Sequence, residues 1–359
     1  ELVRAEALRR AARPRVSAAR ISDFVRVNRV EGLSVGAGAT IPLAATVSAR
    51  ATSRYGLDDR MAKFRVGAAW NAARDLTVSI AGFDEFRDAG QTPESSTLAN
   101  SIAAQEFGAD VTDEFRAIGL AVALEGGRGI RWRAALERTR ESPLAVNARP
   151  FSGEYRAAFE ADRVAATTAR IDLSGRRDAG PIGAQFDWRL TAAAIALDQN
   201  QVAVDHVGHL ASVAAEFGAQ RDLAVGSLQL WALGAVTTGG RVPAQSAVLL
   251  GGPVSAPGYV AHSLRGQAGG AVRLEYQIPV GRFPLDLGRF GATRVGVSIA
   301  PFVAAARAGQ GTDSGWRRSV GVGVISLYDL FRIDIVRGLD SGGAWVVRAD
   351  FTRKLWSIL

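Results

Sequence analysis

Residues 267–359 constrain the fold most strongly, because apolar and polar side chains alternate there with a period of two. From Val272 to Ile278, apolar residues at even positions alternate with charged or amide residues at odd positions. Residues 345–355 repeat the pattern in the opposite phase, and residues 320–324 and 331–335 alternate as well. Successive side chains of a β-strand point to opposite faces of the sheet. The pattern therefore predicts consecutive strands, each with one apolar and one polar face.

The number and length of these segments favour a membrane protein over a soluble sandwich. Alternating segments of about 10 residues recur along almost the whole chain, as expected for tilted strands that span a bilayer. Aromatic residues lie mostly near the segment ends, at Trp70, Trp188, Trp316, Phe331, Trp345 and Trp356. We predict an all-β fold, a transmembrane antiparallel β-barrel of about 16 strands (14 to 16), in the outer membrane of a Gram-negative bacterium.

Composition and charge are consistent with this class. The 40 glycines allow a closed sheet to bend, and the absence of cysteine excludes disulfides and thiolate metal sites. A net charge of +8 raises the question of nucleic acid, but the arginines are spread along the strands and form no patch with stacking aromatics. Two uncharged stretches, residues 32–49 and 223–240, contain glycines, and the first also contains Pro42 and alternates. We expect strands there, and no membrane-spanning helix or bound nucleic acid.

The expected order of elements divides the chain into two parts. Residues 1–30 form an N-terminal basic arm, with a short helix over residues 1–15, and residues 31–359 form the barrel. The first hairpins are expected at 33–43 with 45–54, 63–71 with 76–83, and 118–124 with 130–137. A long loop or lid, residues 84–114, has a helical centre at 96–107, and a second long loop covers residues 237–266. Further strands are expected around 155–161, 169–174, 185–191, 202–217 and 223–236.

The second long loop and the strand after it carry a family resemblance. Residues 249–259 (LLGGPVSAPGY) and 273–280 (RLEYQIPV) resemble the sixth extracellular loop and the following strand of the bacterial surface antigen superfamily, the BamA-like insertases and translocons. Residues 24–32 resemble the start of the barrel in a less characterised branch. The resemblance implies a role in protein translocation or assembly at the outer membrane. Its loop motif falls on Gly251, Gly252, Pro257, Gly258 and Tyr259.

The sequence departs from the family pattern at two places. The family loop usually carries an arginine before Gly-Phe or Gly-Tyr, which contacts an acidic residue of the lumen wall. Pro257 stands at that position here, and Arg265 is a nearby arginine that could replace it. The roughly 30 residues before the first expected strand are also too few for one of the family's periplasmic receptor repeats.

Catalysis is not expected. The chain has three histidines, and His206 and His209 would lie on opposite faces of a strand. His262 lies in the second long loop near Ser255 and Ser263, without an orienting acid nearby in sequence, so loop polarity explains it better. Asp110 and Asp113 lie in the first long loop, where calcium or solvent suits them better than catalysis. We predict no enzyme, no cofactor and no metal site.

The polar faces of the strands predict a charged lumen. A lipid-facing Arg or Lys at mid-membrane costs about 2 to 4 kcal/mol, so the strand charges must share the inner face. Some would form a ladder of ion pairs across strands, and an excess of arginine would favour anions in an open channel. The alternatives to translocation or assembly are thus a passive, porin-like anion pore, or a structural barrel that anchors partner proteins. The partners expected are the lipid bilayer and periplasmic or outer-membrane proteins, the latter bound through the N-terminal arm. The lumen charges selected are Arg131, Arg133, Arg273, Glu275, Arg332, Asp334, Arg348 and Asp350.

Overall fold

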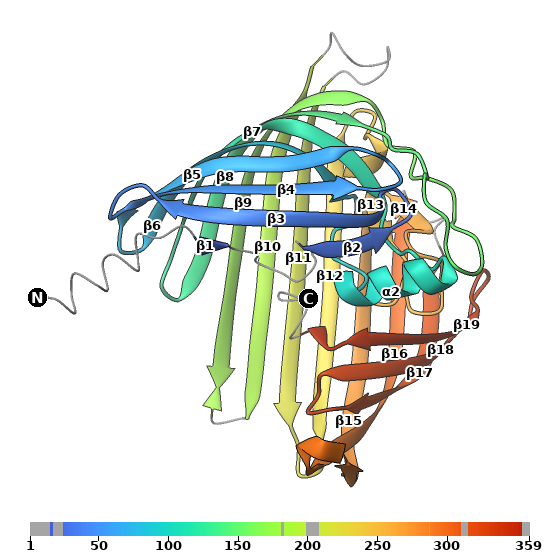
Figure 1. The fold of residues 1–359 in the computed structure, drawn as a ribbon. Helices are drawn as coiled ribbons and strands as arrows, with labels where there is room; N and C mark the ends of the chain where they lie inside the picture. The colour runs from blue at the N-terminus through green and yellow to red at the C-terminus, as the bar shows by residue number, and fades with distance from the viewer. Residues whose placement is uncertain are drawn as a thin grey trace, which may run out of the picture.

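Sixteen antiparallel strands follow one another in a single curved sheet, which confirms the predicted fold class. The computed structural model describes residues 15–16, 24–180, 183–198, 208–286, 288–309 and 315–353. Each strand pairs with the next one in the chain, from β2 to β19. Figure 1 shows the strands wrapping around a central space.

The first half of the sheet comprises β2 (Val25–Asn28), β3 (Gly32–Pro42), β4 (Val47–Gly56), β5 (Ala62–Ala73), β6 (Leu76–Asp88), β7 (Glu114–Gly126), β8 (Ile130–Ser142) and β9 (Val164–Ala179). The second half comprises β10 (Ala184–Leu197), β11 (His209–Asp222), β12 (Ser227–Gly239), β15 (Ala268–Asp286), β16 (Ala292–Gly309), β17 (Arg317–Ser326), β18 (Phe331–Gly338) and β19 (Trp345–Phe351). Two short strands, β13 (Val248–Leu250) and β14 (Leu264–Gly266), pair with each other outside this sheet.

The sheet is not closed. Among the described residues no register joins β19 to β2, so both strands keep a free edge, and we call the gap between them the seam. A two-residue strand, β1 (Arg15–Val16), pairs with the same edge of β3 as β2 does, further along β3. The first strand of the sheet is therefore interrupted, and the sheet begins before the predicted start at residue 33.

Short turns and long loops lie at opposite ends of the sheet. Residues 43–46, 74–75, 127–129, 223–226 and 327–330 form tight connections at one end. The other end carries the long loops 89–113, 143–163 and 240–267, with 3-10 turn η4 (Ala244–Ser246) in the last. Outer-membrane barrels have short periplasmic turns and longer extracellular loops, so the long loops mark the extracellular end.

The helix predicted at 96–107 is confirmed as α2 (Thr97–Phe107), in loop 89–113. Ser96 caps its first turn by accepting a hydrogen bond from Ala99 N, and Gly108 ends it in a left-handed conformation. Two other predicted elements have different outcomes. Residues 155–161 are not a strand. The predicted helix over residues 1–15 lies, apart from Arg15 in β1, outside the described residues, as do His206, Lys354 and Trp356.

The outer face of the sheet is apolar and exposed. Ile80, Leu120, Leu136 and Val303 are each more than half exposed. These residues alternate with inward-facing Phe83, Ala121 and Ala304, which are buried. An exposed belt of this kind fits contact with lipid and not with water. Within the described part of the chain, no helix has the length and apolar content to cross a membrane.

Candidate functional site: the seam and the loop plug

Loop 240–267 folds into the lumen. Val248 and Leu250 of β13 are fully buried against inward-facing residues of β12, β15 and β16, among them Leu233, Ala271 and Ala306. The intervening Leu249 points the other way and packs with Phe83, Phe115 and Ala117 of β6 and β7. Since β13 touches both sides of the wall, it fills the interior at this level. We call loop 240–267, with the segments of loops 89–113 and 143–163 that bind it, the plug.

A single carboxylate, Asp113, joins the plug segments. It pairs with Arg29 of the β2–β3 turn, with Arg156 of loop 143–163 at 2.8 Å, and with His262 Nδ1 of loop 240–267 at 2.8 Å. Burial would raise the pKa of Asp113, but the His262 hydrogen bond and the arginine charges lower it below its ordinary value. Burial would likewise lower the pKa of His262, and Asp113, Asp88 and Glu94 raise it instead. The plug therefore favours the protonated imidazole more than water does.

The second buried carboxylate of the plug, Glu94, holds the loop motif. Its Oε2 accepts hydrogen bonds from Val254 N at 2.7 Å and Ser255 N at 3.1 Å, and its Oε1 accepts one from Ser255 Oγ at 2.5 Å. Burial raises the pKa of Glu94, which these hydrogen bonds partly offset. Ser255, the serine near His262, thus donates its hydroxyl to the carboxylate of Glu94. This arrangement explains Ser255 as a structural anchor and not as a nucleophile.

The interpretation of His262 as a polar loop residue was wrong. Its side chain is buried and pairs with an acid that is distant in sequence, and Nε2 has no hydrogen-bond partner among the described residues. Asp110 and Asp113 likewise serve the protein itself: Asp110 accepts from Arg29 N at 2.8 Å, Asn100 Nδ2 at 3.0 Å and Thr112 N at 2.9 Å. These contacts leave the two carboxylates engaged in fixing the loops.

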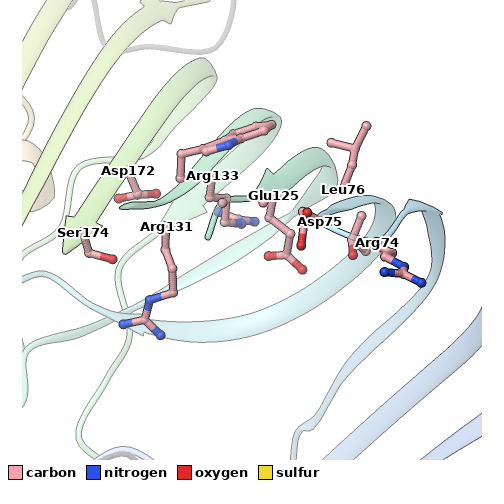
Figure 2. Close-up of a pocket in the computed structure, with 12 residues that line it drawn as sticks. Arg74, Asp75, Leu76, Glu125, Arg131, Arg133, Asp172 and Ser174 are labelled. Carbon is pink, nitrogen blue, oxygen red and sulfur yellow. The ribbon is translucent and has the colours of Figure 1, made fainter. Parts of the chain in front are cut away.

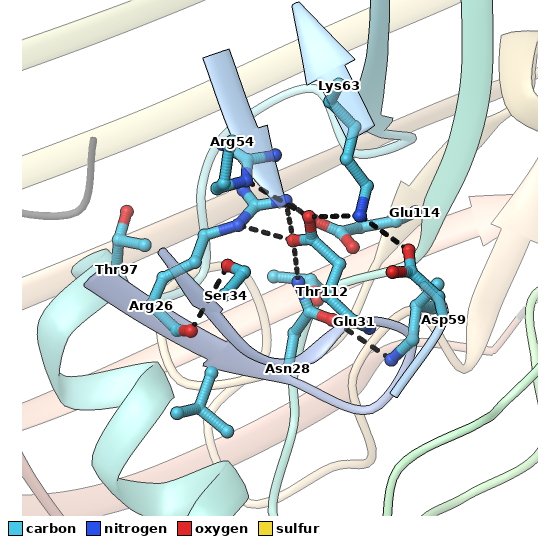
Figure 3. Close-up of polar contacts among 12 residues, drawn as sticks. Arg26, Asn28, Glu31, Ser34, Arg54, Asp59, Lys63, Thr97, Thr112 and Glu114 are labelled. Carbon is cyan, nitrogen blue, oxygen red and sulfur yellow. Dashed lines mark hydrogen bonds and ion pairs between the residues drawn. The ribbon is translucent and has the colours of Figure 1, made fainter. Parts of the chain in front are cut away.

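A buried ion cluster fixes the turn between β2 and β3, beside the seam. Glu31 is fully buried, and its carboxylate contacts Arg26 Nε at 2.6 Å, Arg54 Nε at 3.0 Å and Lys63 Nζ at 3.0 Å. Figure 3 shows these three cations converging on Glu31 from β2, β4 and β5. Burial would raise the pKa of Glu31, but the three charges lower it to about 2. The edge strand β2 is thereby held firmly at its extracellular end.

The predicted loop motif lies inside the plug. Pro257 is fully buried, and Tyr259 Oη donates to Arg318 O at 2.8 Å and accepts from Asp340 N at 2.9 Å. Gly258 has φ +84°, and a Cβ there would lie 2.6 Å from Gly338 N, so a side chain would not fit. Gly251 and Gly252 form the preceding bend around Ser255. Tyr259 therefore ties the loop tip to the segments next to β17 and β19.

The family resemblance implies that an arginine of the loop contacts an acidic residue of the lumen wall. Here arginines of the wall itself pair with the wall acids. Arg332 on β18 donates to Glu275 on β15 at 2.6 and 2.7 Å and to Asp334 at 2.8 Å. Arg273 donates to Glu275 at 2.8 Å and lies 3.6 Å from the centre of the Phe302 ring. Arg265 does not take this role, because it is exposed on β14. We call Arg273, Glu275, Phe302, Arg332 and Asp334 the wall cluster.

Arg131 and Arg133 line the short-turn end of the lumen, away from the plug. A cavity of about 390 Å³ lies there, bounded by residues of β6–β9 and of the turns before β6 and after β7, among them Arg74, Glu125 and Asp172. Figure 2 shows Arg131 and Glu125 projecting to the same side of the sheet. The other predicted charges lie near the seam: Arg348 Nε is 3.9 Å from Asp350 Oδ2 on β19. The buried carboxylate Glu31 and the plug carboxylates Glu94 and Asp113 are not among the charges selected from the sequence.

Comparisons with known proteins bear on the fold. Neither a protein-family model nor a curated protein sequence matches the chain. Among solved structures it is similar to BamA from Haemophilus ducreyi lacking POTRA domains 1–3, with a TM-score of 0.60 and 13% identity over 97% of this chain and 77% of that chain. CdiB from Escherichia coli gives a TM-score of 0.49 and 11% identity over 90% of this chain and 60% of that chain. CdiB from Acinetobacter baumannii gives 0.48 and 14% over 90% and 57%.

At these identities the likeness concerns the fold, and it agrees with the resemblance seen in residues 249–280. The exposed apolar belt, the sixteen sequential strands and the loop that enters the lumen all belong to this architecture. The chain therefore has the fold of an outer-membrane β-barrel, similar to that of BamA.

Proposed function

We propose that the chain acts in protein translocation or assembly at the outer membrane, and that the seam is where it acts. The observation that carries the proposal is that, in the part of the chain the structure describes, no register joins the edges of β2 and β19. An unpaired edge presents N–H and C=O groups that can pair with another extended chain. In hydrocarbon, such groups need a partner, so an incoming strand would be stabilised there.

The remaining features support a binding role over catalysis. His262 and Ser255 are buried and engaged with Asp113 and Glu94, which leaves no exposed nucleophile and base pair among them. The partners we propose are the bilayer and an unfolded outer-membrane protein. Binding of partners through the N-terminal arm stays a prediction.

The test is assisted folding in liposomes. The purified protein is reconstituted, and the folding of an added urea-unfolded eight-stranded outer-membrane protein is followed by its acquired protease resistance. Val25 lies on β2 with its N–H on the side away from β3, because the neighbouring Phe24 O accepts from Gly36 N of β3. Val25→Pro removes this N–H and should slow client folding several-fold, whereas Val25→Ala keeps it and should not. Equal rates in protein-free and protein-containing liposomes would contradict the proposal.

The passive anion pore remains a second candidate, because arginine outnumbers the acids among the charges expected on the inner face. The plug opposes it, since β13 contacts both sides of the wall. Single-channel recording decides between the two.

A further inference from the structure

Helix α2 occupies the seam. It lies against both β2 and β19, and Figure 1 shows it in the gap between them. Ser101 Oγ accepts a hydrogen bond from Val27 N at 3.0 Å. Because residues 24, 26 and 28 face β3, Val27 N points to the free edge of β2. A serine hydroxyl thus takes the place of the backbone carbonyl that a neighbouring strand would supply.

The two serines before α2 hold it to the last strand, β19. Asp350 on β19 accepts hydrogen bonds from Ser95 Oγ at 2.8 Å and from Ser96 Oγ at 2.7 Å. Ser96 also caps the helix, so the carboxylate of Asp350 lies at the positive end of the helix dipole. The two edges of the sheet are therefore connected through one helix, and not through a strand ladder.

The attachment of α2 to the strands is slight compared with its attachment to the loops. Its C-terminal end is held by Phe151 N, which donates to Gln105 O at 2.7 Å, and by Ser152 N, which donates to Glu106 O at 3.1 Å. Asn100 binds Asp110 of the same loop at 3.0 Å. On the outer side Ile102 and Phe107 are 53% and 67% exposed. Leaving the seam therefore breaks the contacts of Ser101 and Asp350 and also that of Asn100, while the contacts of Gln105 and Glu106 are kept.

We propose that α2 is a detachable latch across the seam, which blocks the edge of β2 and ties it to β19. The contacts at Ser101 and Asp350 hold the latch closed, and an extended polypeptide segment pairs with β2 only after α2 leaves. The pairing of a polypeptide segment with β2 rests on the proposed function, whereas the closed position of the latch does not depend on it.

The first experiment tests the latch without a client. Ser101→Ala removes the acceptor of the Val27 N–H, while alanine preserves the helix because it is the best helix former. Hydrogen exchange of the β2 amides should become about fivefold to tenfold faster, the loss of one hydrogen bond. Ser53→Ala, on the exposed outer face of β4, is the matched control and should leave exchange unchanged. Unchanged β2 exchange in Ser101→Ala would overturn the latch.

The second experiment closes the latch reversibly. The sequence contains no cysteine, so Val27→Cys with Ser101→Cys gives a unique pair on the two sides of the contact between β2 and α2. Loss of free thiol on oxidation verifies the disulfide before the assay. In the liposome folding assay, the oxidised protein should lose client folding and regain it when dithiothreitol is added, with oxidised wild type as the control. Equal activity in both redox states contradicts the latch. Failure of wild type and reduced protein alike contradicts the proposed function instead, and leaves the exchange result to decide the latch.

Discussion

Three buried carboxylates that face groups distant in sequence, Glu31, Glu94 and Asp113, organise the extracellular end of the barrel. Each is satisfied by hydrogen bonds or cations, as burial of a charge requires. Removing one member of a buried ion cluster leaves the remaining charges without compensation, which is more destabilising than losing an exposed pair. Single substitutions at these carboxylates are therefore expected to have large effects.

Glu31→Gln should destabilise the barrel by about 3 to 5 kcal/mol, because Arg26, Arg54 and Lys63 would then face one another without their shared anion. The urea midpoint for loss of heat-resistant mobility on gels measures the effect. Glu125→Gln is the control, since Glu125 is exposed at the short-turn end of β7, and it should change the midpoint little. Equal midpoints for the two variants would refute the role given to the Glu31 cluster.

The same cluster predicts an acid-sensitive part of the stability. The pKa of Glu31 is lowered from its ordinary value of 4.5 to about 2. A lowered pKa means stability that is present above pH 4.5 and is lost as the pH falls towards 2. Urea midpoints measured across this range should fall in wild type and fall less in Glu31→Gln. Parallel curves for the two proteins would show that another group is responsible.

At the scale of elements, the strand β17 is shaped by the wall cluster. A Cβ on the inward-facing Gly323 would lie 2.6 Å from Arg332 Nη2 and 2.7 Å from Asp334 Oδ1. Gly323→Ala should therefore displace the cluster and cost about 1 to 3 kcal/mol. Gly296→Ala on β16, where nothing lies within 4 Å of the added atom, provides the control. Thermal unfolding followed by circular dichroism compares them, and equal melting temperatures would refute the crowding.

Loop 240–267 should loosen as the pH rises. The raised pKa of His262 means that its contribution is complete below its ordinary value of 6.5 and is lost as the pH rises through the higher value in the plug. Ala256 is 1% exposed, so Ala256→Cys reports opening by its reaction with a maleimide. We compare the labelling rates of Ala256→Cys in the His262→Gln and wild-type backgrounds at the same pH. The ratio of these two rates should approach one at alkaline pH. A ratio that does not change with pH would contradict the assignment.

The sequence predicted most of the strands and the helix, but not how these elements contact one another. Alternation found the hairpins 33–54 and 118–137, because a period of two follows from strand geometry alone. The helix expected at residues 96–107 is bounded in the structure by its caps, Ser96 and Gly108. The plug was missed, although the three apolar residues 248–250 inside a polar loop were a signal of burial. The seam left no signal, since alternation does not depend on whether an edge is paired.

For the whole molecule, the plug decides between a closed barrel and an open pore. Wild type in planar bilayers should show little conductance. Replacing residues 240–267 by a short Gly-Ser linker should open a channel that prefers anions, because arginine outnumbers the acids among the charges expected on the inner face. Cation preference in the deletion variant would contradict the charge assignment. Steady conductance in wild type would favour the passive pore.

The convergence of distant segments on Asp113 has a consequence for biogenesis. Its three partners are residues 29, 156 and 262, so the plug is complete only after most strands have been synthesised and paired. Long-range contacts of this kind form late, because the intervening chain must first be ordered. We therefore expect the interior of the maturing protein to be sealed late in folding.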